Sequence, residues 1–232
     1  MRHTRTWEVY IFSPFLRIWH WIMAAALLML FLTGRYIGHP FFIGSVGVEP
    51  TFAVGNLMSM ETIRFWHFTW AYILTASFIL RIYGWIRYKG DRLLPRFWES
   101  IFWKGVVDDA LHYHFFRLYH PPVLRNSTAR LAYLGAYMVI FTMIATGFSM
   151  YGMINPSSWT AKIFGPVIPL FGNEQNVHVV HNYLAWFFPI FLTIHTYFAY
   201  RADMMQGSGE VSSIFSGIKF LHGKAEDLKD IR

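Results

Sequence analysis

The chain has 232 residues, of which 55% are hydrophobic, 20% aromatic and only 14% charged. An ordinary soluble domain averages roughly a quarter charged residues. The composition therefore excludes such a domain and indicates a membrane protein. The chain has no cysteine, which excludes disulfides, covalently attached haem c and cysteine-ligated iron–sulfur clusters within it. Its net charge of +7 reports membrane topology rather than nucleic-acid binding.

Four segments are apolar enough to span a membrane, at residues 15–35, 65–86, 128–151 and 179–202, since a span needs ~20 such residues. Seventeen of the 20 lysines and arginines lie in the N-terminal segment, around the connection after the second span, or on the C-terminal side. The positive-inside rule therefore places both termini and the connection 87–127 in the cytoplasm. We expect an all-α integral membrane protein, a four-transmembrane-helix bundle forming one membrane domain over 1–232, with a cytoplasmic tail at 203–232.

The connections carry two further patterns. Residues 97–118, between spans two and three, mix aromatic and charged residues and predict an interfacial amphipathic helix. Spans one and three end alike, as FLTGRYIG and IATGFSMYG, each with a Thr-Gly pair near the outer surface. This similarity points to a duplicated helical hairpin.

Four histidines lie within the spans or at their first turns: His20, His67, His181 and His195. An ionisable side chain at membrane depth is costly and by default marks a functional site. The topology puts His20 and His195 near the inner face, and His67 and His181 near the outer face. His181 and His195 are fourteen residues apart in one span, which corresponds to ~21 Å along a helix and about 40° around it.

Pairing the histidines by depth gives His67 with His181 and His20 with His195. Two facing imidazoles inside a helical bundle are what bis-histidine haem ligation requires, so the pattern predicts two haems stacked across the membrane. Hydrogen bonds from the rings to backbone carbonyls are the alternative explanation. His178 forms an H-x-x-H with His181 and is an alternative outer ligand, but it lies about 100° from the phase of His195.

Four arginines are candidate partners of haem propionates. Arg17 and Arg64 lie one helical turn before His20 and His67, in the repeated motifs RIWH and RFWH, and Arg81 and Arg201 lie at the inner ends of spans two and four. Such side chains can reach water and an anionic propionate together. The alternative is that they serve only as topology anchors at the span ends.

These residues carry a family resemblance over nearly the whole chain. The stretches RIWHWIMAAALLMLFLTG, RFWHFTWAYILTASFILRIYG and VHVVHNYLAWFFPIFLTIHTYFAYRAD resemble the b-type cytochrome subunit of membrane-bound nickel-iron hydrogenases. One departure is Asn182, where many relatives have a basic residue after the histidine.

The resemblance implies two non-covalent haems b, with ligand positions that fall on His20, His67, His181 and His195. It also implies two partners outside the membrane, the small (iron–sulfur) and large (nickel-iron) hydrogenase subunits, which pass electrons from H2 through both haems to a quinone. The quinone is expected to be menaquinone, and the membrane is expected to be the bacterial cytoplasmic (inner) membrane. The chain would then be the electron-transfer and quinone-reducing subunit of an H2:quinone oxidoreductase. No catalytic residue is assigned, and the quinone is expected near His195, Arg201 and residues 97–120.

Three other functions stay open. A cytochrome b subunit of a formate dehydrogenase or a related respiratory oxidoreductase would keep the haems and change the partner. A membrane metal transporter would use the histidines for a divalent cation, but no aspartate or glutamate lies inside the four spans, where such a site is expected to place carboxylates. An anchor without haem would leave the matched histidines unexplained.

Overall fold

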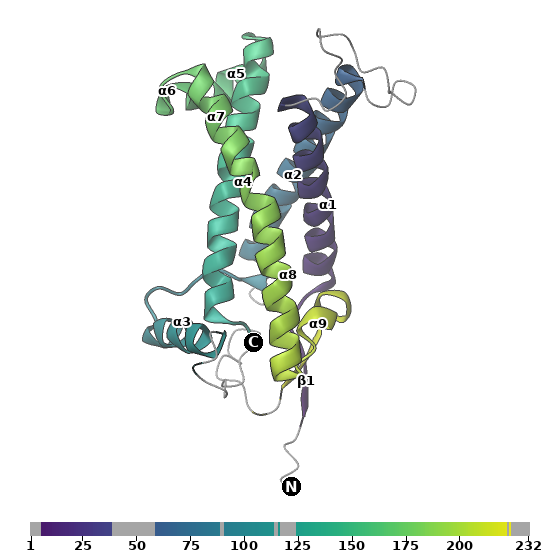
Figure 1. Cartoon of the computed structure of the whole chain (residues 1–232), viewed down its shortest axis with the longest axis vertical. Coiled ribbons are helices and arrows are strands. Elements are labelled where there is room, and N and C mark those ends of the chain that lie inside the picture. Colours follow the sequence, from purple (N-terminus) through teal and green to yellow (C-terminus); the bar gives the residue numbers. More distant parts are fainter. Residues whose placement is uncertain are drawn as a thin grey trace. The chain divides into compact units, whose positions relative to one another are not determined.

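The computed structural model describes residues 6–38, 59–88, 91–113, 116, 124–221 and 223. Its long helices are α1 (Pro14–Gly38), α2 (Met60–Arg87), α4 (Ser127–Ile154), and α7 (Glu174–Ala185) followed by α8 (Phe187–Gln206) (Figure 1). They cover the four segments predicted from the apolar pattern. The predicted helical fold is confirmed in this part of the chain.

Among the described residues, three helices are long and apolar enough to cross a membrane: α1, α4, and α7 together with α8. Helix α2 is as long as α4, at 28 residues, but tryptophan, tyrosine, histidine and arginine side chains make it less apolar. Its role as a fourth span, and the position of the termini, stay predictions.

Helix starts follow local sequence signals. Ser13 caps α1 by accepting a hydrogen bond from the amide of Leu16 at 3.1 Å, and Pro14 takes the first helical position, where no amide hydrogen is needed. Ser59 caps α2 in the same way through the amide of Thr62, at 3.2 Å. With these caps, α1 begins one residue before its predicted span and α2 begins five residues before its own.

The fourth predicted span is interrupted at Trp186, between α7 and α8. Pro189 explains the position of the break, because a proline ring clashes with the carbonyl four residues earlier, and that carbonyl belongs to Ala185, the last residue of α7. The uninterrupted helix assumed for the spacing of His181 and His195 is therefore only approximate.

The shorter elements are α3 (Ser100–Tyr113), α5 (Trp159–Phe164), α6 (Val167–Leu170), α9 (Glu210–Ser216), β1 (Trp7–Tyr10) and β2 (Ile218–Leu221). Helix α3 lies inside the segment predicted as an amphipathic helix, while residues 114, 115, 117 and 118 of that segment fall outside the described residues, as do 222 and 224–232 of the predicted tail. The described part of the tail is not plain coil, because it forms the end of α8, then α9 and β2.

Strands β1 and β2 pair antiparallel, with Trp7 opposite Leu221 and Tyr10 opposite Ile218. The all-α expectation is wrong in this detail. Four-residue strands at opposite ends of a chain leave too short an alternation of polar and apolar residues to be recognised within an apolar sequence.

The chain divides into two compact units, each built from several segments. The first contains residues 1–19, 80–138 and 192–232. Its buried cluster of Ile11, Leu124 and Leu221 packs against Val9 and Phe12, so it joins β1, β2 and the residues before α4. The start of α4 is capped by buried Asp109 of α3, whose Oδ2 accepts a hydrogen bond from the amide of Thr128 at 2.8 Å.

The second unit contains residues 20–79 and 139–191. Here the ring of Phe148 on α4 stacks on Phe164 of α5, with centroids 5.2 Å apart. Gly152 lets α4 approach α5 closely, because a Cβ at this position would lie 2.7 Å from the Cα of Ala161.

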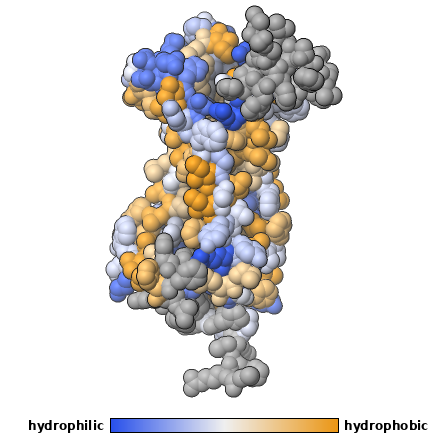
Figure 2. All heavy atoms as spheres, in the orientation of Figure 1, coloured by the Kyte–Doolittle hydropathy of each residue, from blue (hydrophilic) through white to orange (hydrophobic). Residues whose placement is uncertain are grey.

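Large apolar side chains lie exposed along the long helices, including Leu32, Ile79, Phe141 and Ile190. Apolar residues cover much of the face shown in Figure 2. Such surfaces are expected where helices meet lipid tails rather than water.

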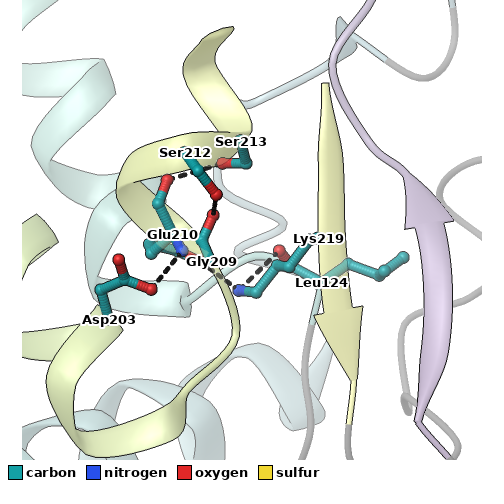
Figure 3. A network of polar contacts seen from close by, with 7 residues as sticks. All are labelled: Leu124, Asp203, Gly209, Glu210, Ser212, Ser213 and Lys219. Atoms are coloured by element: carbon teal, nitrogen blue, oxygen red, sulfur yellow. Dashed lines mark hydrogen bonds and ion pairs between the residues drawn. The ribbon is translucent and has the colours of Figure 1, made fainter. Parts of the chain in front are cut away.

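A polar cluster of seven residues, the C-terminal cluster, joins the end of α8, α9 and β2 within the first unit (Figure 3). Its members are Leu124, Asp203, Gly209, Glu210, Ser212, Ser213 and Lys219. Lys219 is fully buried, and its Nζ lies 2.6 Å from Oε2 of Glu210 and donates to the carbonyl of Leu124 at 3.4 Å. Asp203 accepts a hydrogen bond from the amide of Glu210 at 2.7 Å.

Candidate functional site

His67, on α2, is held by a threonine of α1 in the second unit. Its Nδ1 lies 2.9 Å from Oγ1 of Thr33, and that hydroxyl donates its only hydrogen to the carbonyl of Met29 at 2.6 Å. The threonine oxygen must therefore accept, so Nδ1 of His67 carries the hydrogen. The lone pair on Nε2 is left free to bind a metal ion.

His181, on α7, has the same arrangement with a threonine of α4. Its Nδ1 lies 2.8 Å from Oγ1 of Thr146, which donates to the carbonyl of Thr142 at 2.7 Å. The same reasoning gives the same tautomer, with Nε2 free. Each of these two histidines is therefore prepared as an Nε2 ligand.

A glycine follows each of these threonines and lies against the ring that the threonine holds. A Cβ on Gly34 would lie 3.1 Å from Cε1 of His67, and a Cβ on Gly147 would lie 3.3 Å from Cε1 of His181. Both distances are shorter than ordinary van der Waals contact. The rings lie where only glycine leaves full space for them.

The two prepared histidines belong to the same unit. His178 is exposed, whereas His181 is bonded to Thr146. This geometry favours His181 over His178 as the inward-facing ligand of the H-x-x-H.

Among the residues that the structure describes, no three His, Cys, Asp or Glu side chains gather in a group that could hold a metal ion. A bare divalent cation needs such a group, because protein side chains must supply most of its ligands. Haem iron needs only one or two axial protein ligands. Two prepared imidazoles are therefore enough axial ligands for haem iron, whereas within the described residues they are too few for a bare divalent cation.

His20 and His195 fall in different units. Each is half-buried on its helix, and the ring of His20 packs edge-on against Trp21, with centroids 5.1 Å apart. Their pairing as inner ligands stays a prediction.

Arg81 is the most buried of the four candidate arginines, at 3% exposure. Its Nε donates to the hydroxyl of Tyr137 at 3.0 Å, its Nη2 donates to the carbonyl of Asp91 at 2.6 Å, and the guanidinium lies over the ring of Trp19 at 5.3 Å. Its Nη1 is buried and has no hydrogen-bond partner within the described protein. A buried cationic donor left in this state fits an anionic group supplied by a ligand.

The other three arginines have different surroundings. Arg17 donates to the carbonyl of Phe215 and, at 3.4 Å, to the hydroxyl of Tyr10, so it ties α1 to α9 and β1. Arg201 donates to the hydroxyl of Tyr197 at 2.6 Å, and Arg64 is exposed at the start of α2. The contacts of Arg17 favour a structural role, while propionate binding by all three stays a prediction.

The sequence-based reasoning did not assign Thr33, Thr146, Tyr137 or Trp19 to the site. The signal for the threonines was present, because both belong to the Thr-Gly pairs that end spans one and three. What was missing was the contact with a histidine on another helix, which spacing along one helix does not reveal.

A family model described as Prokaryotic cytochrome b561 matches residues 11–217. Its relatives include two proteins with the name Probable Ni/Fe-hydrogenase B-type cytochrome subunit and one with the name Probable Ni/Fe-hydrogenase 1 B-type cytochrome subunit. The relative from Cupriavidus necator is 35% identical and covers 90% of this chain and 86% of its own. The relative from Rhizobium leguminosarum bv. viciae is 33% identical and covers 90% of this chain and 88% of its own. The one from Escherichia coli K12 is 29% identical and covers 90% of this chain and 90% of its own.

Proposed function

Because the chain belongs to the prokaryotic cytochrome b561 family, we propose that it is a dihaem b-type cytochrome that carries electrons from an extracytoplasmic nickel-iron hydrogenase across the membrane to quinone and anchors that enzyme. The names of its relatives support the hydrogenase partner. The four long helices support the expected four spans, and the distribution of lysine and arginine supports cytoplasmic termini.

The observation that carries the proposal is the matched preparation of His67 and His181. Each ring has Nδ1 occupied by a threonine hydroxyl and Nε2 free, and neutral imidazole with a free Nε2 is the form that binds haem iron. A bound haem b supplies reversible one-electron chemistry. His67 and His181 would hold the outer haem, and His20 with His195 would hold the inner one.

Arg81 supports an anionic ligand in the first unit. Its buried Nη1 lacks a protein partner, and a haem propionate is a carboxylate that this nitrogen can bind. Tyr137 and the carbonyl of Asp91 fix the guanidinium, so it can neutralise a propionate without rotating. Arg17, Arg64 and Arg201 are the remaining candidates for this role.

The experiment is a haem count on the detergent-purified chain, by pyridine haemochrome and by reduced-minus-oxidised spectra. We expect about two haems b per chain in wild type, loss or disruption of the outer haem in His67→Ala and His181→Ala, and of the inner haem in His20→Ala and His195→Ala. His178→Ala is the matched control, since it lies one turn from His181 on α7 and should retain both haems. A folded wild type without haem would overturn the proposal.

The partner is tested separately, by purifying the chain with its natural complex and identifying the metal in the attached large subunit. Nickel supports the hydrogenase assignment. Molybdenum or tungsten would instead identify a formate dehydrogenase or a related oxidoreductase, with the haem assignment unchanged.

A further inference from the structure

We propose that Thr33 with Gly34 and Thr146 with Gly147 are two copies of one positioning device that sets the tautomer and the orientation of the outer haem ligands. The inference rests on the proposed function, because it takes His67 and His181 to be ligands. It adds four residues to the site and assigns a role to the Thr-Gly repeat of the sequence.

The two copies match contact by contact. In each, a threonine hydroxyl donates to the carbonyl four residues earlier in its own helix and accepts from the histidine Nδ1 of another helix, over 2.9 Å for His67 and 2.8 Å for His181. In each, the next residue is a glycine under Cε1 of the same ring. The first copy joins α1 to α2, and the second joins α4 to α7.

The hydrogen bond fixes which nitrogen of the ring binds iron. Without an acceptor, a buried imidazole can carry its hydrogen on either nitrogen, and only the Nδ1–H form offers Nε2 to a metal. An outer partner of this kind also raises the basicity of the ligating nitrogen. A hydroxyl does this without a negative charge, so the ring stays a neutral imidazole.

The glycine fixes the position of the ring edge. Cε1 lies between Nδ1 and Nε2, so a surface against Cε1 limits the tilt of the ring about its hydrogen bond. A methyl group on Gly34 would approach Cε1 of His67 to 3.1 Å, and one on Gly147 would approach Cε1 of His181 to 3.3 Å. Either alanine would displace its ring by a few tenths of an ångström, more for Gly34 than for Gly147.

The test compares threonine variants of the full-length, haem-loaded protein. Thr33→Val and Thr146→Val keep the side-chain shape and remove the hydrogen-bond acceptor, whereas Thr33→Ser and Thr146→Ser keep the hydroxyl. Thr69→Val is the matched control, because Thr69 makes the same bond to a carbonyl, Phe65 at 2.8 Å, and lies about 200° around α2 from His67.

The readouts are the electron paramagnetic resonance spectrum of the oxidised haems, their midpoint potentials and the rate of haem transfer to apomyoglobin. We expect each valine variant to shift the g values of one haem, to raise its potential because its ligand becomes less basic, and to speed its release on the order of 10-fold or more, as for other lost partners of metal ligands. The serine variants and Thr69→Val should match wild type.

Gly34→Ala and Gly147→Ala provide an independent measurement if a valine variant does not fold. They keep every hydrogen bond but displace the ring. We therefore expect shifted g values for the same haem, with the larger shift in Gly34→Ala. Valine and alanine variants that match wild type in all readouts would overturn the inference, as would Thr69→Val giving the same changes.

Failure of this inference differs from failure of the proposed function. If His67→Ala and His181→Ala lose the outer haem while the threonine and glycine variants are silent, only the positioning role is wrong. If the wild type holds no haem, or if both histidine variants keep two haems, the ligand assignment itself is wrong.

Discussion

The ion pair at the centre of the C-terminal cluster should show an asymmetric cost when its two sides are removed. Lys219 is fully buried, and its Nζ has two partners, Oε2 of Glu210 at 2.6 Å and the carbonyl of Leu124 at 3.4 Å. The Glu210 side chain is 24% exposed. Loss of the carboxylate therefore leaves a fully buried charge, whereas loss of the ammonium leaves a partly exposed side chain whose Oε2 is buried.

The magnitude follows from this difference. Glu210→Gln should lower the free energy of unfolding by about 3 kcal/mol, the lower end of the range for breaking a buried pair, because the partial exposure of Glu210 weakens the interaction. Lys219→Met should cost less, about 1 kcal/mol, since the methionine fills similar space and only one oxygen of a partly exposed carboxylate loses its partner. The double variant should resemble Lys219→Met.

The assay is equilibrium unfolding in mixed micelles, followed by circular dichroism. Glu8→Gln is the control, because Glu8 is an exposed acid on β1, and surface changes of this kind usually stay within about 0.5 kcal/mol. A larger cost for Lys219→Met than for Glu210→Gln would refute the reasoning, since it would mean that the charge stabilises the fold by more than its burial costs.

Three further predictions concern other contacts. Arg81→Gln should lower the free energy of unfolding by about 2–3 kcal/mol, because it removes two hydrogen bonds from a charged donor. It should also reduce the haem content in the haemochrome assay, and an unchanged haem content would argue against binding of a propionate by Arg81. Gly152→Ala should lower the free energy of unfolding by ~1–3 kcal/mol by overpacking α4 on α5. Gly135 has open space on the same helix, so Gly135→Ala should be neutral or stabilising. Thermal unfolding of both variants checks this, and equal effects would contradict it. Asp109→Ala should lower the free energy of unfolding by about 1–2 kcal/mol, because the amide of Thr128 loses its cap. Thermal unfolding would also detect this loss. A midpoint equal to that of wild type would show that the cap is not needed.

The apolar pattern was enough to predict the long helices. Segments such as 15–35 and 128–151 are apolar along most of their length, so their helical state depends on few competing signals. The predicted boundaries fell short of the observed ones, because caps such as Ser13 lie outside the apolar stretch. The break at Trp186 could have been inferred from Pro189, whose effect reaches four residues back.

The site was predictable only in part, because its supporting contacts join distant segments. Histidine identity and depth can be read from single spans, and they led to His67 and His181. The bond from Thr33 to His67 crosses 34 residues, and the one from Thr146 to His181 crosses 35. The following glycine sets these two threonines apart from Thr69 and Thr75, whose hydroxyls bond to a carbonyl of their own helix, but it does not say which histidine each threonine meets.

The pairing of β1 with β2 has a consequence for biosynthesis. Residues 7–10 are made first among the described elements, yet their strand partner is residues 218–221, so β1 must wait for nearly the whole chain to be translated and inserted. Arg17 likewise waits for the carbonyl of Phe215. The first unit can therefore close only after translation has passed β2, which makes its closure a late step of biosynthesis.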